Sequence, residues 1–414
     1  MKAQPTHMGP TLGLLLVLLL WEVAGQLQWV GDGALPAPTQ VLQQFWIDRA
    51  DYPVHIWGTL RTALAGFVVG NLVAVLAGLF FVWWRPAQRL MAGINVTLFA
   101  MPAIALVPIL VIALPGDTPR VVLAALSVYY PTMVATVLGL TQVDPRLPDL
   151  VRVYGGGELA IVRYVRLRSG LPTLLAGLRV AAPAAVLGSL LAEFGSGGSA
   201  GLGTYLIGSL GRADPARLWG IGLAATAISG LAYLAVDLAA RRFAGNTLSV
   251  STPVGSQAGA PTEGWPFRAG MAMAALAMPL LFWYLVVLMF QALGVSDVVL
   301  RTPVGVFEHL FLADNAVDNL QRLGAALGET LPYTLLGMLA GLLVAFVLAV
   351  ATTVWPGLGR TLLPLSLVSQ SMPLVALTPL VVLVFGRDMA SILVITVSLL
   401  VAGFSVGWNL SVPL

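Results

Sequence analysis

The chain has 414 residues, of which 58% are hydrophobic and only 9% are charged, and its net charge at neutral pH is +3. This composition is typical of a polytopic membrane protein and excludes a soluble domain with an ordinary polar surface. Arginines beside membrane spans account for so small a positive excess, and we therefore expect no nucleic acid partner. The absence of cysteine excludes disulfides and thiolate chemistry.

A leucine-rich segment, residues 11–20, opens the chain and runs on into Trp21 and Glu22. A secretory signal peptide is the alternative interpretation, but no small-x-small cleavage site follows, so we predict a retained first span. Residues 31–52 contain prolines and aspartates, and we predict an outer loop there. Further spans are predicted at residues 59–84, 90–114 and 120–140.

The second of these spans contains two prolines, Pro102 and Pro108, in the segment MPAIALVP. A proline inside a span leaves a backbone carbonyl that other protein groups or water must satisfy. A simple packing kink is one interpretation. Because the same pattern recurs later in the chain, we favour a kinked helix beside a conduit.

Residues 141–172 form the longest polar interruption of this half of the chain. They contain three consecutive glycines, Gly155–Gly157, and apolar residues three or four apart. This pattern predicts a sharp turn and short helices with one apolar face. The arginines are expected to keep the segment cytoplasmic, and an ordinary basic loop is the alternative to a docking element. These arginines are Arg146, Arg152, Arg163, Arg166 and Arg168.

Another span is predicted at residues 173–192. Residues 193–203 are too rich in glycine to favour a helix, and we expect a capping or re-entrant turn at the outer mouth. A span at residues 218–240 closes the first unit, and residues 243–266 have the composition of a flexible linker. Beyond the linker, spans are predicted at residues 269–293, 330–355, 361–385 and 390–410, with an outer loop between the first two.

The chain repeats itself at a shift of 271 residues. Gly66 aligns with Gly337, Trp84 with Trp355, and MPAIALVP with MPLVALTP at residues 372–379. Chance similarity of apolar segments rarely keeps glycine, tryptophan and proline in one register, so we predict a duplication with both copies in the same orientation. The predicted units are residues 1–242 and 267–414, with about 10 spans. The second copy stops before its own polar segment, and we expect the chain to be a truncated form of a longer tandem protein.

The segment around residues 141–172 resembles the coupling loop of ABC importer permeases. Asp149 takes the acidic position, Gly155 the glycine, and Val165 and Leu167 the Ile-x-Leu positions; Pro172 completes the second Leu-Pro of the branch that imports sulfonates, taurine and nitrate. Arg168 departs from that pattern, as do Leu150 and Val151. Residues 193–203 resemble the Ala-Glu-x-x-Gly and Gly-Leu-Gly segment of the same family.

The resemblance implies an all-α polytopic membrane protein with the MetI-like fold of type I ABC importers. Its implied function is that of the permease of an ATP-driven importer, which moves a small polar or anionic solute across the bacterial inner membrane. The implied partners are cytoplasmic ABC ATPase subunits, a periplasmic solute-binding protein, membrane lipid and a second permease copy. The implied docking residues are Asp149, Gly155, Val165, Leu167 and Pro172.

No enzyme is expected from the residues themselves. A P-loop needs a phosphate-binding lysine, and Lys2 is the only lysine. The three histidines lack ligand spacing, so neither a metal nor a cofactor is expected. Polar groups in apolar spans are conduit candidates, with interhelical hydrogen bonds as the alternative interpretation. The candidates are Asn95, Tyr130, Ser369, Gln370 and Ser371.

Two other functions remain open from the sequence. A secondary transporter or channel with parallel repeats would use intramembrane carboxylates, for which Glu22, Glu193 and Asp237 are the candidates. A membrane scaffold without transport would not explain the repeated proline pattern. We expect no arginine or lysine inside the spans that could pair with an anionic solute.

Overall fold

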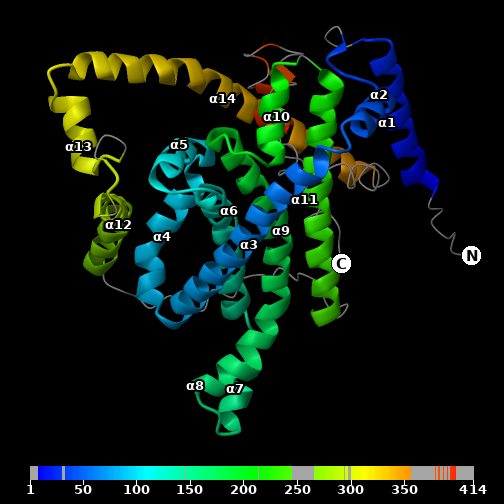
Figure 1. Cartoon of the computed structure of the whole chain (residues 1–414). Helices are drawn as coiled ribbons and strands as arrows, with labels where there is room; N and C mark the ends of the chain where they lie inside the picture. The colour runs from blue at the N-terminus through cyan, green and yellow to red at the C-terminus, as the bar shows by residue number, and fades with distance from the viewer. Residues whose placement is uncertain are drawn as a thin grey trace, which may run out of the picture. The chain divides into compact units, whose positions relative to one another are not determined.

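The computed structural model describes residues 8–29, 33–144, 146–212, 214–244, 265–292, 294–296 and 300–355, with a few further residues between 378 and 397. Throughout these residues the regular elements are helices, which confirms the all-α prediction (Figure 1). In chain order the long helices are α1 (Met8–Gln26), α3 (Tyr52–Trp83), α4 (Arg85–Ala100), α5 (Ala103–Ala113), α6 (Thr118–Thr141), α9 (Leu167–Ser196), α11 (Pro215–Ala244), α12 (Trp265–Ala292) and α14 (Ala316–Val354).

Six of the described helices are long and apolar enough to cross a bilayer, or seven if α4 and α5 form one broken span. This confirms a multi-pass membrane protein. Two predicted spans, residues 361–385 and 390–410, lie largely outside the described residues.

Helices α3 and α6 approach each other through small residues. A Cβ atom added at Gly66, Gly70 or Gly78 of α3 would come within 2.3 to 2.7 Å of a side-chain atom of α6. The facing residues are Ala124, Val128 and Thr136, each 58 positions later in the chain. A constant offset means that the two helices run parallel, and the missing side chains allow their backbones to approach closely.

Helices α6 and α9 pack in the opposite sense. Gly170 of α9 faces Gly139, and Gly188 faces Ser127, so the contact position moves backwards along α6 as it moves forwards along α9. The pair is therefore antiparallel. Helix α6 packs against both α3 and α9, and its buried residues include Leu123, Val128 and Thr132.

The chain breaks between α4 and α5 at Met101 and Pro102, where the two helices meet at an angle of 93°. Both residues have extended backbone angles. Proline restricts the preceding residue to the extended region and lacks the N–H that would continue the helix. The predicted kink is confirmed at Pro102, whereas Pro108 lies inside α5.

Two predicted loops contain helices. Residues 31–52 include α2 (Pro38–Ile47), which begins with proline in its first turn, a favourable position. The predicted turn at residues 193–203 is wrong at its start, because α9 continues to Ser196 and ends at Gly197, whose φ is +58°. The helix persists because Glu193 is buried among polar partners described below, and tertiary contacts override weak propensity.

Three further elements were not predicted. α10 (Leu202–Leu210) follows the Gly-Leu-Gly segment, and α13 (Pro303–Phe307) continues into η3 (Glu308–Leu312) within the predicted outer loop. Helix α14 begins at Ala316 rather than near residue 330. Short loop helices of this kind lack the long apolar runs from which spans are predicted.

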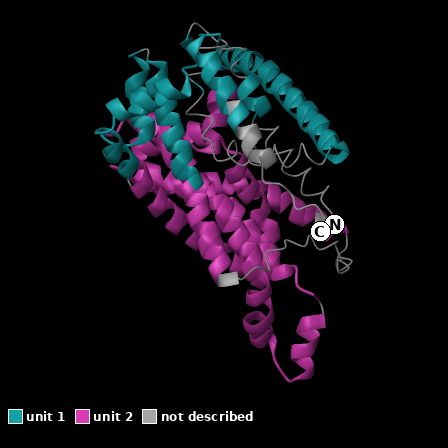
Figure 2. Cartoon of the chain, turned by 90° about the vertical axis from the view of Figure 1, so that its right-hand side faces the viewer, with its two compact units in different colours: residues 1–58, 199–230, 313–414 teal, residues 59–198, 231–312 magenta. Residues whose placement is uncertain are grey.

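The chain divides into two compact units (Figure 2). One contains residues 1–58, 199–230 and 313–414, and the other contains residues 59–198 and 231–312. Within the second unit α12 packs on α4, where a Cβ added at Gly93 would lie 2.4 Å from the carbonyl oxygen of Ala275. The borders of these units differ from the boundaries at residues 242 and 267 that the sequence repeat predicts. The division of the chain into two repeated copies stays a prediction.

An ion pair stabilises the first unit. Arg217 donates from Nε and Nη2 to the two carboxylate oxygens of Asp48, both at 2.6 Å, and both side chains are largely buried. These hydrogen bonds hold the pKa of Asp48 below its usual range, although burial opposes them. The lowered pKa means that the pair stabilises the fold fully above the unfolded-state value and loses its effect as the pH falls.

We predict that Gly66→Ala destabilises the protein in detergent, because the new methyl group would clash with Ala124. Overpacking of this kind costs roughly 1–3 kcal/mol, more than alanine gains in helix propensity. Thermal unfolding measures the change. The matched control is Gly328→Ala in α14, where the space within 4 Å is open. Equal melting temperatures for the two variants would contradict the described α3–α6 contact.

We further predict that Asp48→Asn costs about 3 kcal/mol at pH 7, the loss typical of breaking a buried pair. The wild-type protein should lose this advantage below about pH 4, near the unfolded-state pKa of aspartate. Thermal unfolding between pH 7 and 3 follows both proteins. A constant difference across that range would show that the carboxylate charge is not the source of the stabilisation.

Candidate functional site

The polar segment between α6 and α9 folds into two short helices, α7 (Arg146–Val153) and α8 (Glu158–Ile161). Helix α7 ends in a Schellman motif. The N–H of Gly155 donates to the carbonyl of Arg152 and the N–H of Gly156 to that of Val151, both at 2.9 Å. Gly155 has a φ of +79°, a conformation that side chains disfavour. The predicted sharp turn is therefore present, and Gly155 makes it.

Arg152 joins the two helices across this turn. Its guanidinium donates to Asp149 at 3.1 Å and to Glu158 at 2.9 Å. The hydrogen bond to Glu158 is the main cause that raises the pKa of Arg152, so the guanidinium stays charged. All three side chains are more than half exposed, and pairs of this kind contribute little to global stability. Their role is local: they hold α8 against α7.

The return into the membrane runs through η2 (Val162–Arg166), where the N–H of Leu167 bonds to Val162 five residues earlier. Such π-turns are frequent at functional sites. Ile161 is fully buried and the Val165 side chain is 7% exposed, so these residues anchor the segment. Leu167 is 46% exposed. Pro172 lies inside α9, whose first turns follow η2 directly.

One face of α7 and α8 is apolar and exposed. α7 and α8 project beyond the ends of α6 and α9 (Figures 1 and 2). Exposed apolar clusters rimmed by polar groups mark protein interaction surfaces. We call this set the docking face. Its members, each at least half exposed, are Leu150, Val153, Tyr154 and Leu159.

Two of the conduit candidates, Asn95 and Tyr130, lie near each other, and each contacts a neighbouring helix. Tyr129 donates to the amide oxygen of Asn95 at 2.9 Å, which is the interhelical hydrogen bond that the alternative interpretation anticipated. Tyr130 stacks on Phe99 with ring centroids 4.4 Å apart. Asn95 and Tyr130 line one cavity of about 210 Å³. Ser369, Gln370 and Ser371 lie outside the described residues.

The expectation of no cation inside the spans is wrong. Arg179 lies in the middle of α9, and its Nε is 3.0 Å from Oδ1 of Asp237 in α11. Arg241 pairs with the other oxygen of the same carboxylate at 2.7 Å. A charge in the bilayer is costly unless it is paired, which explains the arrangement. Opposite charges in two predicted spans, Arg179 and Asp237, were the signal for this pair in the sequence.

Glu193 is fully buried in a cluster of hydroxyl groups that joins α3 to α9. Thr59 donates to its Oε2 at 3.0 Å, and Ser189 to its Oε1 at 3.4 Å. The Thr62 and Ser189 hydroxyl oxygens are 2.6 Å apart. The carboxylate is thus held by polar partners. Among the described residues, acidic and histidine side chains form no cluster that could hold a metal ion.

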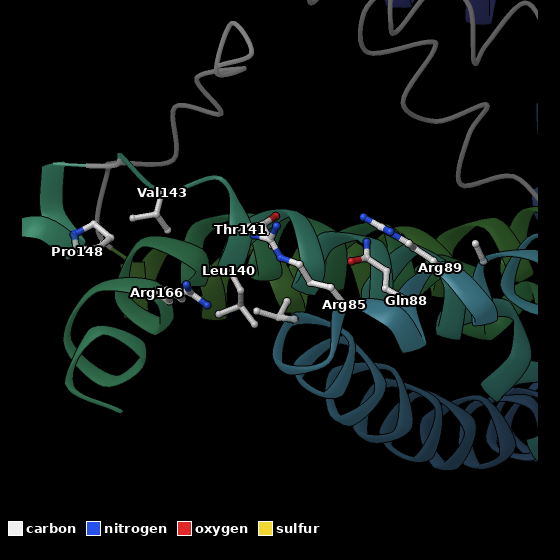
Figure 3. Close-up of a pocket in the computed structure, with 10 residues that line it drawn as sticks. Arg85, Gln88, Arg89, Leu140, Thr141, Val143, Pro148 and Arg166 are labelled. Carbon is white, nitrogen blue, oxygen red and sulfur yellow. The ribbon is translucent and has the colours of Figure 1, made fainter. Parts of the chain in front are cut away.

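We call α7, α8 and η2 together the docking element. A basic cavity of about 560 Å³ opens beside its base (Figure 3). Arg85 and Arg89 come from the first turns of α4, and Arg166 comes from η2. In the view of Figure 3 the Arg85 side chain lies between Arg166 and the neighbouring pair Gln88 and Arg89. Among the described residues that line the cavity, none is acidic.

Comparison with known proteins identifies relatives of this chain. Residues 70–247 match the family described as the inner membrane component of binding-protein-dependent transport systems. The chain is 27% identical over 235 residues to a probable ABC transporter permease protein of Haemophilus influenzae. The aligned region covers 56% of this chain and 96% of that protein.

Two relatives carry more specific names. The formylaminopyrimidine transport permease protein ThiX of Halalkalibacterium halodurans is 27% identical over 209 residues, 50% of this chain and 82% of its own. The putative aliphatic sulfonates transport permease protein SsuC of Escherichia coli is 27% identical over 168 residues, 40% of this chain and 64% of its own.

We predict that Arg152→Ala loosens the docking element without changing global stability. Asp149 and Glu158 then lose their common partner, while exposed salt bridges of this kind contribute little to global stability. Hydrogen exchange at the amides of residues 154–161 should become faster, and the melting temperature should stay the same. The matched control is Arg163→Ala, which removes an exposed arginine from the same segment. Equal exchange in both variants would mean that Arg152 does not join the helices.

Proposed function

We propose that this chain is the inner membrane component of a binding-protein-dependent transport system and that α7 and α8 couple it to an ATPase; the family match of residues 70–247 supports the proposal. The protein is the membrane-spanning permease of an ABC importer in the inner membrane, a transport component rather than a catalyst. In this proposal separate cytoplasmic subunits hydrolyse ATP, and a solute-binding protein delivers the solute from the outside.

The observation that carries the proposal is the exposed docking face on a rigid base. Leu150, Tyr154 and Leu159 offer apolar surface to a groove of a partner, since burial of such side chains drives association. Gly155 and Arg152 fix the angle between the two short helices. Val165 supports them from the inside rather than by direct contact, which refines the role that the resemblance implies for it.

The connection of this element to the spans supports transmission of movement. Helix α9 starts at Leu167, directly after η2, and runs for 30 residues to Ser196. A helix of that length is about 45 Å long, enough to cross the membrane. A displacement of the docking face can therefore reach the Glu193 cluster at the far end of α9.

We propose a small polar or anionic solute. The names of two relatives support this range, since one names formylaminopyrimidine and another names aliphatic sulfonates. Asn95 and Tyr130 stay candidates for the conduit because they share a cavity. Ser369, Gln370 and Ser371 stay candidates on the sequence alone.

The proposed duplication has structural support in the register of buried residues. Helix α14 buries Gly337, Gly341 and Ala345, which stand 271 positions after the buried residues Gly66, Gly70 and Ala74 of α3. A Cβ at Gly66 would lie 2.8 Å from the carbonyl oxygen of Val121, and one at Gly337 would lie 3.0 Å from that of Ile392, again 271 positions apart.

The ends of the two helices agree as well. The N–H of Trp84 bonds to Phe80, and that of Trp355 bonds to Ala351, both at 2.8 Å. The backbone angles of the two tryptophans are φ −122° and ψ 86°, and φ −120° and ψ 85°. We propose on this basis that residues 316–397 begin a second permease copy in the same chain.

We predict that Gly155→Glu abolishes association with the ATPase, because it forces a charged side chain into a left-handed backbone position beside the docking face. Gly155→Asn should retain most of the association, since asparagine tolerates that conformation. The measurement is the amount of ATPase that co-purifies from native membranes in mild detergent. Gly157→Glu is the charge control, because its backbone conformation is ordinary.

A second variant separates the turn from the apolar contact. Leu150→Ser keeps the fold of α7 but removes apolar area from the docking face, and it should reduce co-purification severalfold. If the Leu150→Ser variant and the Gly155→Glu variant each recovered the full amount of ATPase, the assignment of the docking face would be contradicted.

We predict from the duplication that Gly341 lies beside Thr396, as Gly70 lies beside Ala125 in the first copy. The chain contains no cysteine, so a Gly341→Cys, Thr396→Cys pair can be tested in an unmodified background. Oxidation should link this pair efficiently, because disulfides form only between Cβ atoms about 3.8 Å apart. Efficient linkage with Val397→Cys instead of Thr396→Cys would contradict the predicted register.

A further inference from the structure

The basic cavity at the base of the docking element has no role in the proposed coupling. It is lined by three guanidinium groups, the Gln88 amide and the Thr141 hydroxyl. Its volume of about 560 Å³ lies within the range of small-molecule sites, about 300–1,000 Å³. The charged residues among the described part of its lining are all arginines, so its potential is positive.

The three arginines reach the cavity from two separate elements. Arg85 and Arg89 lie one turn apart on α4, and Arg166 lies on η2, 77 residues after Arg89. Because Arg85 and Arg166 line one open space from separate elements, an anion that enters it can bind to both guanidinium groups. Guanidinium groups suit the oxygens of phosphate because each offers several N–H donors in a plane.

The position of the cavity indicates the source of the anion. Arg85 follows directly after Trp83 and Trp84, whose side chains are 88% and 52% exposed. Exposed tryptophans are typical of the level of lipid headgroups. The excess of arginine at this end, from Arg85 to Arg168, indicates the cytoplasmic face. Basic pockets between spans on that face bind acidic headgroups.

We propose that this cavity binds the phosphate group of an anionic phospholipid from the cytoplasmic leaflet. The bound phosphate lies between Arg85 on α4 and Arg166 at the base of the docking element. It bridges the guanidinium groups of Arg85 and Arg166 and ties the docking element to the membrane surface. The proposal relies on the cytoplasmic orientation of α7 and α8, but it does not require the ATPase.

The test compares lipid retention by the full-length protein purified from vesicles of phosphatidylcholine with one fifth phosphatidylglycerol. Native mass spectrometry in mild detergent counts the lipids that stay bound. The variant Arg85→Gln with Arg166→Gln removes two cavity arginines. Each lost hydrogen bond between a guanidinium and the phosphate costs about 1.5 kcal/mol, so retention of phosphatidylglycerol should fall roughly 100-fold.

The matched control is Arg163→Gln with Arg242→Gln, which removes the same charge from exposed positions on the same face. It should retain phosphatidylglycerol as the wild-type protein does. Size-exclusion profiles and melting temperatures establish that both variants fold. Equal losses in the two variants would show general attraction to a basic surface and overturn the proposal, as would unchanged retention in the cavity variant.

A competition arm identifies the source of the phosphate. Inorganic phosphate at millimolar concentration should leave the bound phosphatidylglycerol in place at constant ionic strength. Displacement by inorganic phosphate, without displacement by the same concentration of chloride, would assign the cavity to a free anion and overturn the lipid assignment. Because ATPase association is not a readout, failure here is distinguishable from failure of the docking proposal.

Discussion

Close approach of α3, α6 and α9 through small residues is the constraint on which the rest of the structure depends. Lipid is as apolar as leucine, so apolar helices gain little from leaving it, and van der Waals packing between backbones holds them together instead. Gly66, Gly70 and Gly78 provide this for α3, and Gly170 and Gly188 provide it for α9. Helix α6 takes part in both contacts, so its position fixes the direction and register of the other two.

Several polar groups inside this bundle have partners from neighbouring helices. Thr132 donates to Asn71, Tyr129 donates to Asn95, and Glu193 accepts from Thr59. Arg179 and Asp237 form an ion pair. A secondary transporter would need carboxylates that exchange protons with the conduit, whereas Glu193 and Asp237 are each held between two helices. They specify which helices meet and at which register, and the match of residues 70–247 to inner membrane transport components agrees with an importer permease.

In the proposed function the docking element couples the helix bundle to an ATPase. Ile161 and Val165 anchor it from within, Gly155 reverses the chain, and the exposed face stays available to a partner. Its base is shared with the basic cavity, because Pro148 and Arg166 line that cavity together with Arg85. One short segment therefore meets protein on one side and, in our proposal, a lipid phosphate on the other.

The sequence by itself determined the class of protein and most of its spans, because apolar runs of about 20 residues have one stable conformation in a bilayer. It also determined the break at Pro102, the turn at Gly155 and the family resemblance of residues 141–172, since these depend on local backbone chemistry. It did not predict that Val165 points inward or that Glu193 extends α9, because neighbours distant in the chain decide both. Only the tertiary structure brought Arg85 and Arg166 to one cavity and Arg179 beside Asp237, because the distances between these charges are set by helix packing.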